Sequence, residues 1–441
     1  MEVVNDELVV TDEEGELFDY NPKSKESQRI QETLFHEKQS IIENCLFGVD
    51  INPNSVKICR LRLWIELLKN AYYKNATELE TLPNIDINIK CGNSLVSRFD
   101  IDADLKQALK KSKWSIDSYQ VAVDTYRNAE SKEQKREMKR LIADIKSDFR
   151  SEISLNDPKV KRLRKLSGEL FQMTNQQQLF EMSKKEKAAW NKKVAKLTED
   201  TKKLETEIEA IKANKIYENA FEWRFEFPEV LDDEGNFMGF DVVIGNPPYV
   251  QIQKMEFDFD SIKSKYQTFE QTGDIYALFY EKGLEILTSY GLLSFITSNK
   301  WLRANYGQSL RKFFCSHTSC LQLIDFNYFQ VFPEASVDTN ILTFQRGTTE
   351  DIENATLINQ GFELENIREY VEQNKIEITG LSSNYWSIIP KERSSLNEKL
   401  KLQGKELKDW NISMNYGIKT GLNDAFIIDS ETRKKLLEIN L

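Results

Sequence analysis

Apolar and polar residues form two kinds of periodic pattern along this chain. Short apolar runs rich in β-branched residues predict core strands at residues 46–50, 85–90, 240–244, 292–297, 321–326 and 336–344. A polar helix is expected at 24–43, and apolar residues at helical spacing predict helices at about 55–69 and 272–287. A hairpin is expected over residues 7–18. Strands that alternate with helices predict an α/β fold with a largely parallel sheet.

Residues 102–220 depart from this alternation. They lack turn residues over long spans and are rich in Lys, Glu, Gln and Ala. A seam with the spacing of a coiled coil is predicted at Val194, Leu197, Thr201, Leu204, Ile208 and Ile211. A partner helix is predicted to contribute Met138, Leu141, Ile145 and Phe149. We therefore expect a long antiparallel helical hairpin, a coiled-coil insertion into the α/β domain, with its bend near 155–180.

Composition limits the classes of chemistry. The 441 residues carry a net charge of −11, so any contact with nucleic acid must come from a local basic patch. Five cysteines show no pairing framework, which favours a reducing cytoplasm. The only histidines, His36 and His317, cannot form a zinc cluster, and no metal site is expected. Neither a signal peptide nor a membrane-spanning apolar run is apparent.

The densest basic run lies inside the predicted insertion. Residues 102–220 contain 27 Lys and Arg against 20 Asp and Glu, whereas the rest of the chain is acidic. The candidate DNA-binding residues are Lys161, Arg162, Arg164 and Lys165. Side chains of this kind can follow a phosphate backbone with salt-dependent affinity. The solvated face of a long helix explains the same run at least as well.

The strand at 240–244 runs directly into Gly245-Asn246-Pro247-Pro248-Tyr249. In α/β sheets, ligands bind beyond the carboxyl ends of such strands. The two prolines fix their φ angles and donate no hydrogen bond, so this loop is stiff and its carbonyls are available. Asn246 adds an amide, and Tyr249 adds a flat ring with a polar tip. This combination suits a planar group that carries an exocyclic amine.

Asn246-Pro247-Pro248-Tyr249 after an apolar strand resembles the catalytic motif of S-adenosylmethionine-dependent amino-methyltransferases. The resemblance is greatest to adenine-N6 DNA methyltransferases, including the methyltransferase part of large type IIG-like restriction–modification enzymes. It implies that the Asn246 side chain and the Pro247 carbonyl hold the target amine. It also implies that Tyr249 stacks on a base swung out of duplex DNA. The expected fold is then the Rossmann-like sheet of these methyltransferases, with S-adenosylmethionine as cofactor.

Further segments resemble the cofactor motifs of the same family. Asp50 and Ile51 follow the strand at 46–50, where the resemblance implies contacts to the ribose and the adenine of the cofactor. Asp50 as a simple cap of the next turn is the alternative. Asn93 and Ser94 follow the third strand, with Asn93 where the family usually has Asp. Asp274 opens a helix whose start lines the cofactor pocket in the family.

A second ring for the extruded base is expected between the last two predicted strands. In the family, an aromatic residue in this segment covers the face of the base opposite the Tyr. Phe332 is the candidate that the resemblance implies, with Phe329 in reserve. Core packing explains Phe332 equally well.

One family motif has no counterpart in this sequence. The first motif is a strand with a Gly-rich turn, but no Gly-x-Gly precedes Asp50. We therefore expect a fragment whose sheet lacks its central first strand, a gap that the strand near residues 8–10 could fill. Residues 416–428 resemble the entry to a target-recognition domain, which the remaining residues are too few to complete.

These patterns predict four parts and one function. The parts are an incomplete cofactor half at 1–100, the helical insertion at 101–220, the catalytic half at 221–347, and a linker with the start of a target-recognition region at 348–441. The predicted function is site-specific methylation of adenine N6 in duplex DNA after base flipping, within a restriction–modification or phage-defence system. Partners are duplex DNA and the rest of a parent chain. Alternatives are an inactive fragment that acts as a DNA-binding or interaction module, and an amino-methyltransferase for protein glutamine or RNA.

Overall fold

The computed structural model describes residues 2–388 with internal gaps, some residues of 389–412 and none of 413–441. The gaps before 388 are 5–6, 12–14, 81, 102–108, 130, 176–182, 214–216, 218, 256–258, 260–262, 335–336, 349–350 and 360–361. The chain divides into two compact units, Met1–Ser387 and Ile388–Leu441. All elements named below belong to the first unit. The predicted entry to a target-recognition domain, 416–428, lies outside the described residues.

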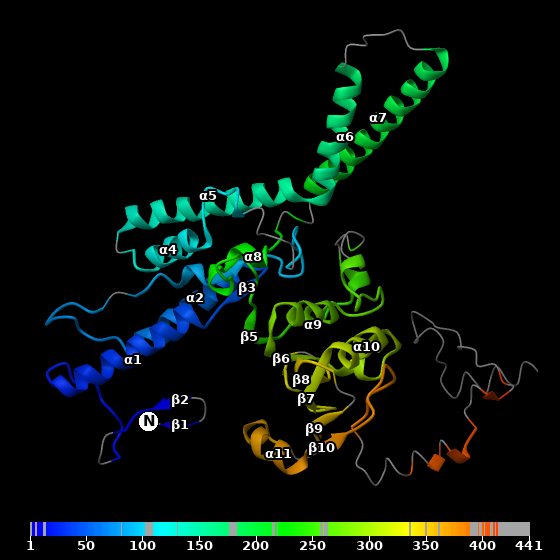
Figure 1. Cartoon of the computed structure of the whole chain (residues 1–441). Helices are drawn as coiled ribbons and strands as arrows, with labels where there is room; N and C mark the ends of the chain where they lie inside the picture. The colour runs from blue at the N-terminus through cyan, green and yellow to red at the C-terminus, as the bar shows by residue number, and fades with distance from the viewer. Residues whose placement is uncertain are drawn as a thin grey trace, which may run out of the picture. The chain divides into compact units, whose positions relative to one another are not determined.

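A six-stranded mixed sheet is the main framework of the first unit (Figure 1). Its strand order is β10-β9-β7-β8-β6-β5. β5 pairs in parallel with β6, and β7 pairs in parallel with β9, while the other neighbours are antiparallel. The strands are β5 (Phe240–Gly245), β6 (Leu287–Ser298), β7 (Thr318–Asp325), β8 (Thr339–Arg346), β9 (Ile352–Leu357) and β10 (Ile376–Ile378). The fold is therefore mixed α/β, and the strands predicted from 240 to 344 are confirmed.

Helices lie before and between the strands of this sheet, and one of them corresponds to the helix predicted at 272–287. They are α8 (Trp223–Glu226), α9 (Tyr276–Glu285), α10 (Gln308–His317) and α11 (Ile367–Asn374). α9 enters β6 after one residue, and α10 leads straight into β7. The elements after residue 350, β9, α11 and β10, have no counterpart in the predictions. Among the described helices, none is both long and apolar enough to span a membrane.

A second, two-stranded parallel sheet precedes this framework. It consists of β3 (Gly48–Asp50) and β4 (Ile89–Cys91), flanked by α1 (Lys25–Asn44) and α2 (Pro53–Leu68). Ser24 and Asn52 cap the two helices, and Pro53 suits the first turn of α2. The buried Asn88 amide donates to the carbonyls of Ile42, Glu43 and Leu46, which fastens the end of α1 to the sheet. The strand predicted at 85–90 is shorter, because Ile85–Ile87 forms a 3-10 turn.

The N-terminal hairpin differs from the prediction. β2 (Glu7–Val9) pairs with β1 (Glu2–Val4), although Phe18 N–H also donates to Val10 O as a 7–18 hairpin requires. Because β2 pairs with β1, the expectation that this strand fills the gap in the main sheet is wrong.

Aromatic side chains join the two sheets. Phe47, just before β3, packs edge-on against Phe227 with ring centroids 5.0 Å apart, and lies 5.8 Å from Phe240 of β5. No strand in the described part of the chain pairs with the other edge of β5. Val242 and Ile244, which lie on one face of β5, are 59% and 77% exposed. The prediction of a buried strand at 240–244 is correct for the strand and wrong for its burial.

The helices of the predicted insertion form two pairs rather than one hairpin. α4 (Ile116–Arg127) and α5 (Lys132–Asn156) pack together around Tyr119, Ile145, Phe149 and Phe225. The predicted partner helix therefore covers the α/β core and not the 194–211 seam, so that pairing is wrong. α6 (Pro158–Asn175) lies instead beside α7 (Lys184–Ala213), as Figure 1 shows. Leu197 and Thr201 are buried on the α7 side of this pair.

The placement of α5 predicts unequal effects of two phenylalanine substitutions. Phe149 is 2% exposed in the core, and Phe171 on α6 is 66% exposed. Phe149→Ala should lower the free energy of unfolding by about 3–5 kcal/mol, because it leaves a cavity. The matched control Phe171→Ala should cost less than about 0.5 kcal/mol. Urea denaturation measures both, and equal costs would contradict this packing of α5.

Candidate functional site

The Asn-Pro-Pro-Tyr segment leaves the main sheet at the carboxyl end of β5. Gly245, the last strand residue, pairs with Phe295 of β6. A Cβ at Gly245 would lie 3.1 Å from the Phe295 ring, so the two strands approach closely there. Strand pairing stops next because Pro247 has no N–H. Asn246 is exposed and Pro247 is buried, so the loop presents the amide to solvent from a fixed backbone.

Tyr249 is anchored at both ends of its side chain. Its hydroxyl donates to the carbonyl of Ile296 at 3.1 Å. Its ring meets the ring of Tyr276 edge-on, with centroids 6.3 Å apart. Burial raises the pKa of Tyr249 to about 12, because water no longer stabilises the phenolate. One face of a neutral, fixed ring can therefore serve as a stacking surface.

A short backbone brace holds the chain just after Tyr249. Ile275 N–H donates to Val250 O, and Ile252 N–H donates to Gly273 O, each at 2.9 Å. Asp274 lies within this brace and is buried, and it accepts a hydrogen bond of 3.1 Å from the Tyr306 hydroxyl. The cavity beside Asp274 has a volume of about 10 Å³, room for one water molecule at most.

The candidate cofactor residues lie at the ends of the second sheet. Asp50 and Cys91 are register partners at the ends of β3 and β4, so Asp50 and the following Asn93 emerge at one edge. Asp50 Oδ1 accepts from Asn52 N–H at 2.6 Å, which is the turn cap considered above. A carboxylate has further acceptor positions, so this cap leaves capacity for a ligand. Ile51 is exposed beside it.

Asn93 is partly engaged by its own turn. Its side-chain oxygen accepts from Leu95 N–H at 3.1 Å, and Ser94 O accepts from the Trp223 indole at 3.0 Å. A Cβ at Gly92 would lie 2.9 Å from the Phe221 ring, so the turn is close-packed.

An apolar cluster connects the cofactor candidates with the Asn-Pro-Pro-Tyr segment. Leu95 and Val96, which follow Asn93 and Ser94, share this cluster with Ile252 and Ile275. Ile252 follows Tyr249 by three residues, and Ile275 follows Asp274. The structure therefore brings Asn93, Ser94, Asp274 and Tyr249 into one neighbourhood, although they come from separate parts of the chain.

The two aromatic candidates behave differently. Phe329 is half-buried, meets Phe362 edge-on at 4.9 Å, and packs against a buried cluster that contains Phe326. Phe332 is half-buried, and its carbonyl accepts from the Gln330 amide. Phe329 thus serves the core, while Phe332 stays the candidate stacking ring.

The predicted basic residues are exposed on α6. None of the described α6 side chains is buried, and Lys159 forms an ion pair of 3.6 Å with Glu207 of α7. The four candidates are Lys161, Arg162, Arg164 and Lys165. All four are exposed, and their helix is part of the α6–α7 pair.

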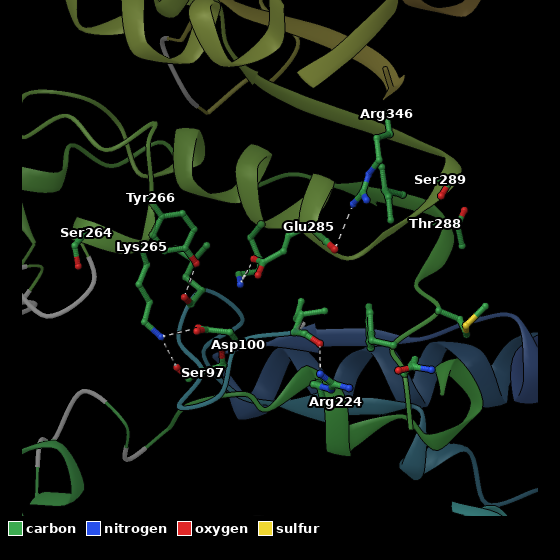
Figure 2. Close-up of a pocket in the computed structure, with 17 residues that line it drawn as sticks. Ser97, Asp100, Arg224, Ser264, Lys265, Tyr266, Glu285, Thr288, Ser289 and Arg346 are labelled. Carbon is green, nitrogen blue, oxygen red and sulfur yellow. Dashed lines mark hydrogen bonds and ion pairs between the residues drawn. The ribbon is translucent and has the colours of Figure 1, made fainter. Parts of the chain in front are cut away.

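A large cavity lies at the opposite end of the main sheet. Its volume is about 1010 Å³, and it is lined by the start of β6 at Leu287 and Thr288 (Figure 2). The cations that line it have protein partners. Lys265 lies 3.3 Å from Asp100 Oδ1, and Arg346 donates to Leu284 O. These cations are thus engaged within the protein, and the volume of the cavity alone does not identify it as the catalytic site.

Sequence reasoning missed the groups that hold Tyr249. Tyr276 follows Asp274 in the same motif, so its aromatic ring was a usable signal. The Ile296 carbonyl is a backbone group, so no residue type in the sequence indicates it. The sequence also gives no signal that the Tyr306 hydroxyl donates to Asp274, which lies thirty-two residues away in the chain.

This arrangement defines an α/β protein with an Asn-Pro-Pro-Tyr loop at the end of a parallel strand. The chain belongs to the Eco57I restriction-modification methylase family, whose model matches residues 44–332. The match includes Asp50, Asn93, Asn246 and Phe332.

Curated relatives carry the same kind of description. A putative type II restriction enzyme and methyltransferase from Methanocaldococcus jannaschii is 26% identical over 361 residues, 72% of this chain and 27% of that protein. The type II restriction enzyme and methyltransferase RM.Eco57I from Escherichia coli is 35% identical over 107 residues, 23% of this chain and 11% of the relative. The matched region of this chain thus spans about a quarter or less of the length of these relatives.

Solved structures match more loosely. The type IIG restriction endonuclease BpuSI gives a TM-score of 0.26 at 18% identity, over 40% of this chain and 23% of that one. A putative class I S-adenosylmethionine-dependent methyltransferase from Listeria monocytogenes gives 0.26 at 13% identity, over 62% and 97%.

The environment of Tyr249 predicts its titration. The folded chain should keep this phenol neutral from its ordinary pKa of about 10 up to about 12. The stability that the neutral phenol contributes should be lost as the pH rises through the higher value. NMR of tyrosines labelled at Cζ, with Tyr249→Phe for assignment, measures the midpoint. Ionisation near pH 10 would mean that water reaches the ring.

Proposed function

We propose that this chain is the catalytic part of an S-adenosylmethionine-dependent DNA methyltransferase of a restriction–modification or phage-defence system. Its target would be the N6 amine of an adenine extruded from the duplex. The observation that carries the proposal is the exposed Asn246 next to the buried Pro247 at the end of β5, with Tyr249 anchored beside them. Family membership supports the reaction class.

The mechanism rests on hydrogen-bond acceptors that are already in place. Asn246 Oδ1 and the Pro247 carbonyl accept from the two hydrogens of the adenine amine. Positive charge develops on this nitrogen as it attacks a methyl group, and both dipoles stabilise that charge. The proline rings fix the carbonyl, so little reorganisation is needed at the transition state. Positioning of the two reactants supplies much of the remaining acceleration.

Tyr249 and Phe332 would enclose the extruded base. When the base leaves the duplex it loses its stacking contacts, which costs roughly a few kcal/mol of free energy. Stacking on an aromatic side chain returns about 1–3 kcal/mol per base. Tyr249 suits one face because its hydroxyl and its ring are both held.

The second sheet carries residues that fit the nucleoside half of S-adenosylmethionine. Asp50 offers a carboxylate for the ribose hydroxyls, and the exposed Ile51 offers an apolar face for the adenine. Asn93 would accept from the adenine amine with an uncharged oxygen, hence more weakly than Asp. The cofactor supplies an electrophilic methyl group when bound. The residues named here orient it, and Asn246 and Pro247 orient the acceptor.

Among the described residues, no strand pairs with the outer edge of β5, which favours completion of the sheet by another segment, such as the rest of a parent chain. Val242 and Ile244, on one face of this strand, are apolar and mainly exposed. An edge of this kind pairs readily with a further strand. If cofactor binding depends on that strand, the 441 residues alone would act as a DNA-binding or interaction module. Calorimetric titration of the chain with S-adenosylmethionine separates these two cases.

Duplex DNA would meet α6 through its basic run. Exposed Lys and Arg side chains displace condensed counterions from the phosphate backbone. This contact would add affinity without sequence information.

Asn246→Ala tests the catalytic assignment. Loss of one preorganised transition-state dipole should lower methyl transfer at least about 100-fold. Cofactor affinity should stay within a few-fold, because Asn246 is not among the residues assigned to the cofactor. Tritium transfer to mixed-sequence DNA and calorimetry measure the two effects in parallel. Equal losses in both would contradict the assigned role.

The methylated product distinguishes the candidate substrates. Nucleosides from the treated DNA, analysed by mass spectrometry, should contain N6-methyladenine. Methylation of RNA or of protein glutamine in place of DNA would support the alternative amino-methyltransferase. Exposed Asn54→Ala is the control that should leave all of these products unchanged.

Charge reversal on α6 tests the proposed DNA contact. Replacement of Lys161, Arg162, Arg164 and Lys165 by Glu should flatten the plot of log affinity against log salt. Each lost phosphate contact reduces the slope by about 0.9. The matched control reverses four exposed charges on α7, at Lys192, Lys193, Lys196 and Lys203. An unchanged slope for the α6 variant would assign α6 a purely structural role.

A further inference from the structure

One aromatic side chain near the carboxyl edge of the main sheet is almost fully exposed. Tyr328 follows β7 and is 85% exposed. Its neighbour Phe326 belongs to a buried cluster with Phe362, and Phe329 packs against that cluster. Among the described rings, none stacks on Tyr328 or meets it edge-on. The side chain therefore projects from an anchored backbone without covering the core.

The turn that carries Tyr328 is held in an unusual conformation. Asn327 has a φ of 52°, in the left-handed region that non-glycine residues seldom occupy. Its N–H donates to the carboxylate of buried Asp325 at 2.9 Å. The same oxygen accepts from the Asn299 amide at 2.8 Å, and Phe329 N–H closes the turn on Phe326 O at 2.8 Å. These anchors fix the backbone from which Tyr328 projects.

Tyr328 lies at the same sheet edge as the Asn-Pro-Pro-Tyr segment. β7 ends at Asp325, which pairs with Asn340 of β8, and Asn340 pairs with Thr297 of β6. β5 ends at Gly245, opposite Phe295. β5 and β7 are separated by three strand spacings, or about 14 Å. At 3.4 Å of rise per base, that distance corresponds to about four steps along one strand.

The charges near this edge nearly cancel. Lys300 and Arg303 are exposed after β6, and Glu334 and Asp338 are exposed before β8. A DNA phosphate would therefore experience little net electrostatic attraction to these four side chains. A nucleobase presents an uncharged π-face, for which an exposed Tyr ring is suited.

We propose that Tyr328 stacks on a nucleobase of the substrate duplex close to the extruded base. The inference rests on the proposed function, because it requires DNA to lie along the edge that holds Asn246. Tyr328 would then stabilise the opened helix, as a second aromatic contact outside the base pocket of Tyr249 and Phe332. Separation of the bases at one step creates the face that the ring covers.

The test compares variants of the whole chain on a fluorescein-labelled 30-base-pair duplex with a central run of five mismatched pairs, which covers the roughly four steps between the extruded base and Tyr328. The mismatched run leaves the faces of these bases open to stacking. Tyr328→Ala should weaken binding on the order of tenfold, while Tyr328→Phe should retain affinity. Tyr290→Ala is the matched control, since Tyr290 is also 85% exposed but lies toward the other end of β6. The salt slope of Tyr328→Ala should equal that of the unmodified chain, because stacking releases no counterions.

Three results would overturn the inference alone. They are equal affinity of Tyr328→Ala and Tyr290→Ala, a reduced salt slope for Tyr328→Ala, and a lower melting temperature for Tyr328→Ala than for Tyr290→Ala. The last would assign Tyr328 to packing within the chain. If the unmodified chain neither binds the duplex nor transfers tritiated methyl groups to DNA, the proposed function fails together with this inference.

Discussion

Parallel pairing of β5 with β6 is the constraint on which the candidate site depends. The register sets Gly245 opposite Phe295, and it thereby places the carbonyl of Ile296 within reach of the Tyr249 hydroxyl. A slip of one residue would turn every β5 side chain to the other face of the sheet. The prolines then end the pairing, because the ladder needs an N–H that they lack. Strand register and proline chemistry together fix where Asn246 lies.

The two sheets are related by side-chain packing and not by backbone pairing. Phe47, Phe227 and Phe240 form aromatic contacts between them, and Leu95 and Ile252 belong to a second apolar contact region. Edge-to-face rings add roughly 0.5–1.5 kcal/mol beyond the area that they bury. The distance between the residues assigned to the cofactor and those assigned to the base is therefore set by packing at these rings.

The sequence predicts the helices and strands of this fold better than it predicts which of them pack against each other. The run at 240–244 is bounded by Gly and Pro, so it identifies β5, but the pattern cannot say that Val242 and Ile244 lie on an exposed face of the strand. Helical spacing likewise identifies the apolar face of α5. It does not say what covers that face, and Phe149 packs on the α/β core instead of on α7. β10 has only three residues, Ile376–Ile378, too few for alternation to show.

In the candidate site, too, the sequence indicates some groups and only the fold shows the others. The motif at Asn246 to Tyr249 is visible because its residue types are rare in combination, whereas the Tyr276 ring and the Ile296 carbonyl that hold Tyr249 require the fold. The sequence ranks Phe332 ahead of Phe329 only through the family resemblance. Only the contact with Phe362 separates the core residue from the candidate for stacking.

The neutrality of the Asn246 loop suits the chemistry assigned to it. An amine that attacks a methyl group gains positive charge only as the bond forms, so fixed dipoles stabilise the transition state more than the ground state. A carboxylate at position 246 would carry its charge throughout, and extrusion of the base would bury that charge at a high desolvation cost. Elsewhere the chain buries charged side chains, and these have partners of opposite charge. Glu226, for example, forms ion pairs of 2.6 Å with Lys146 and 3.3 Å with Arg150. The role proposed for the loop needs no such partners, because Asn246 and the Pro247 carbonyl would act as neutral dipoles.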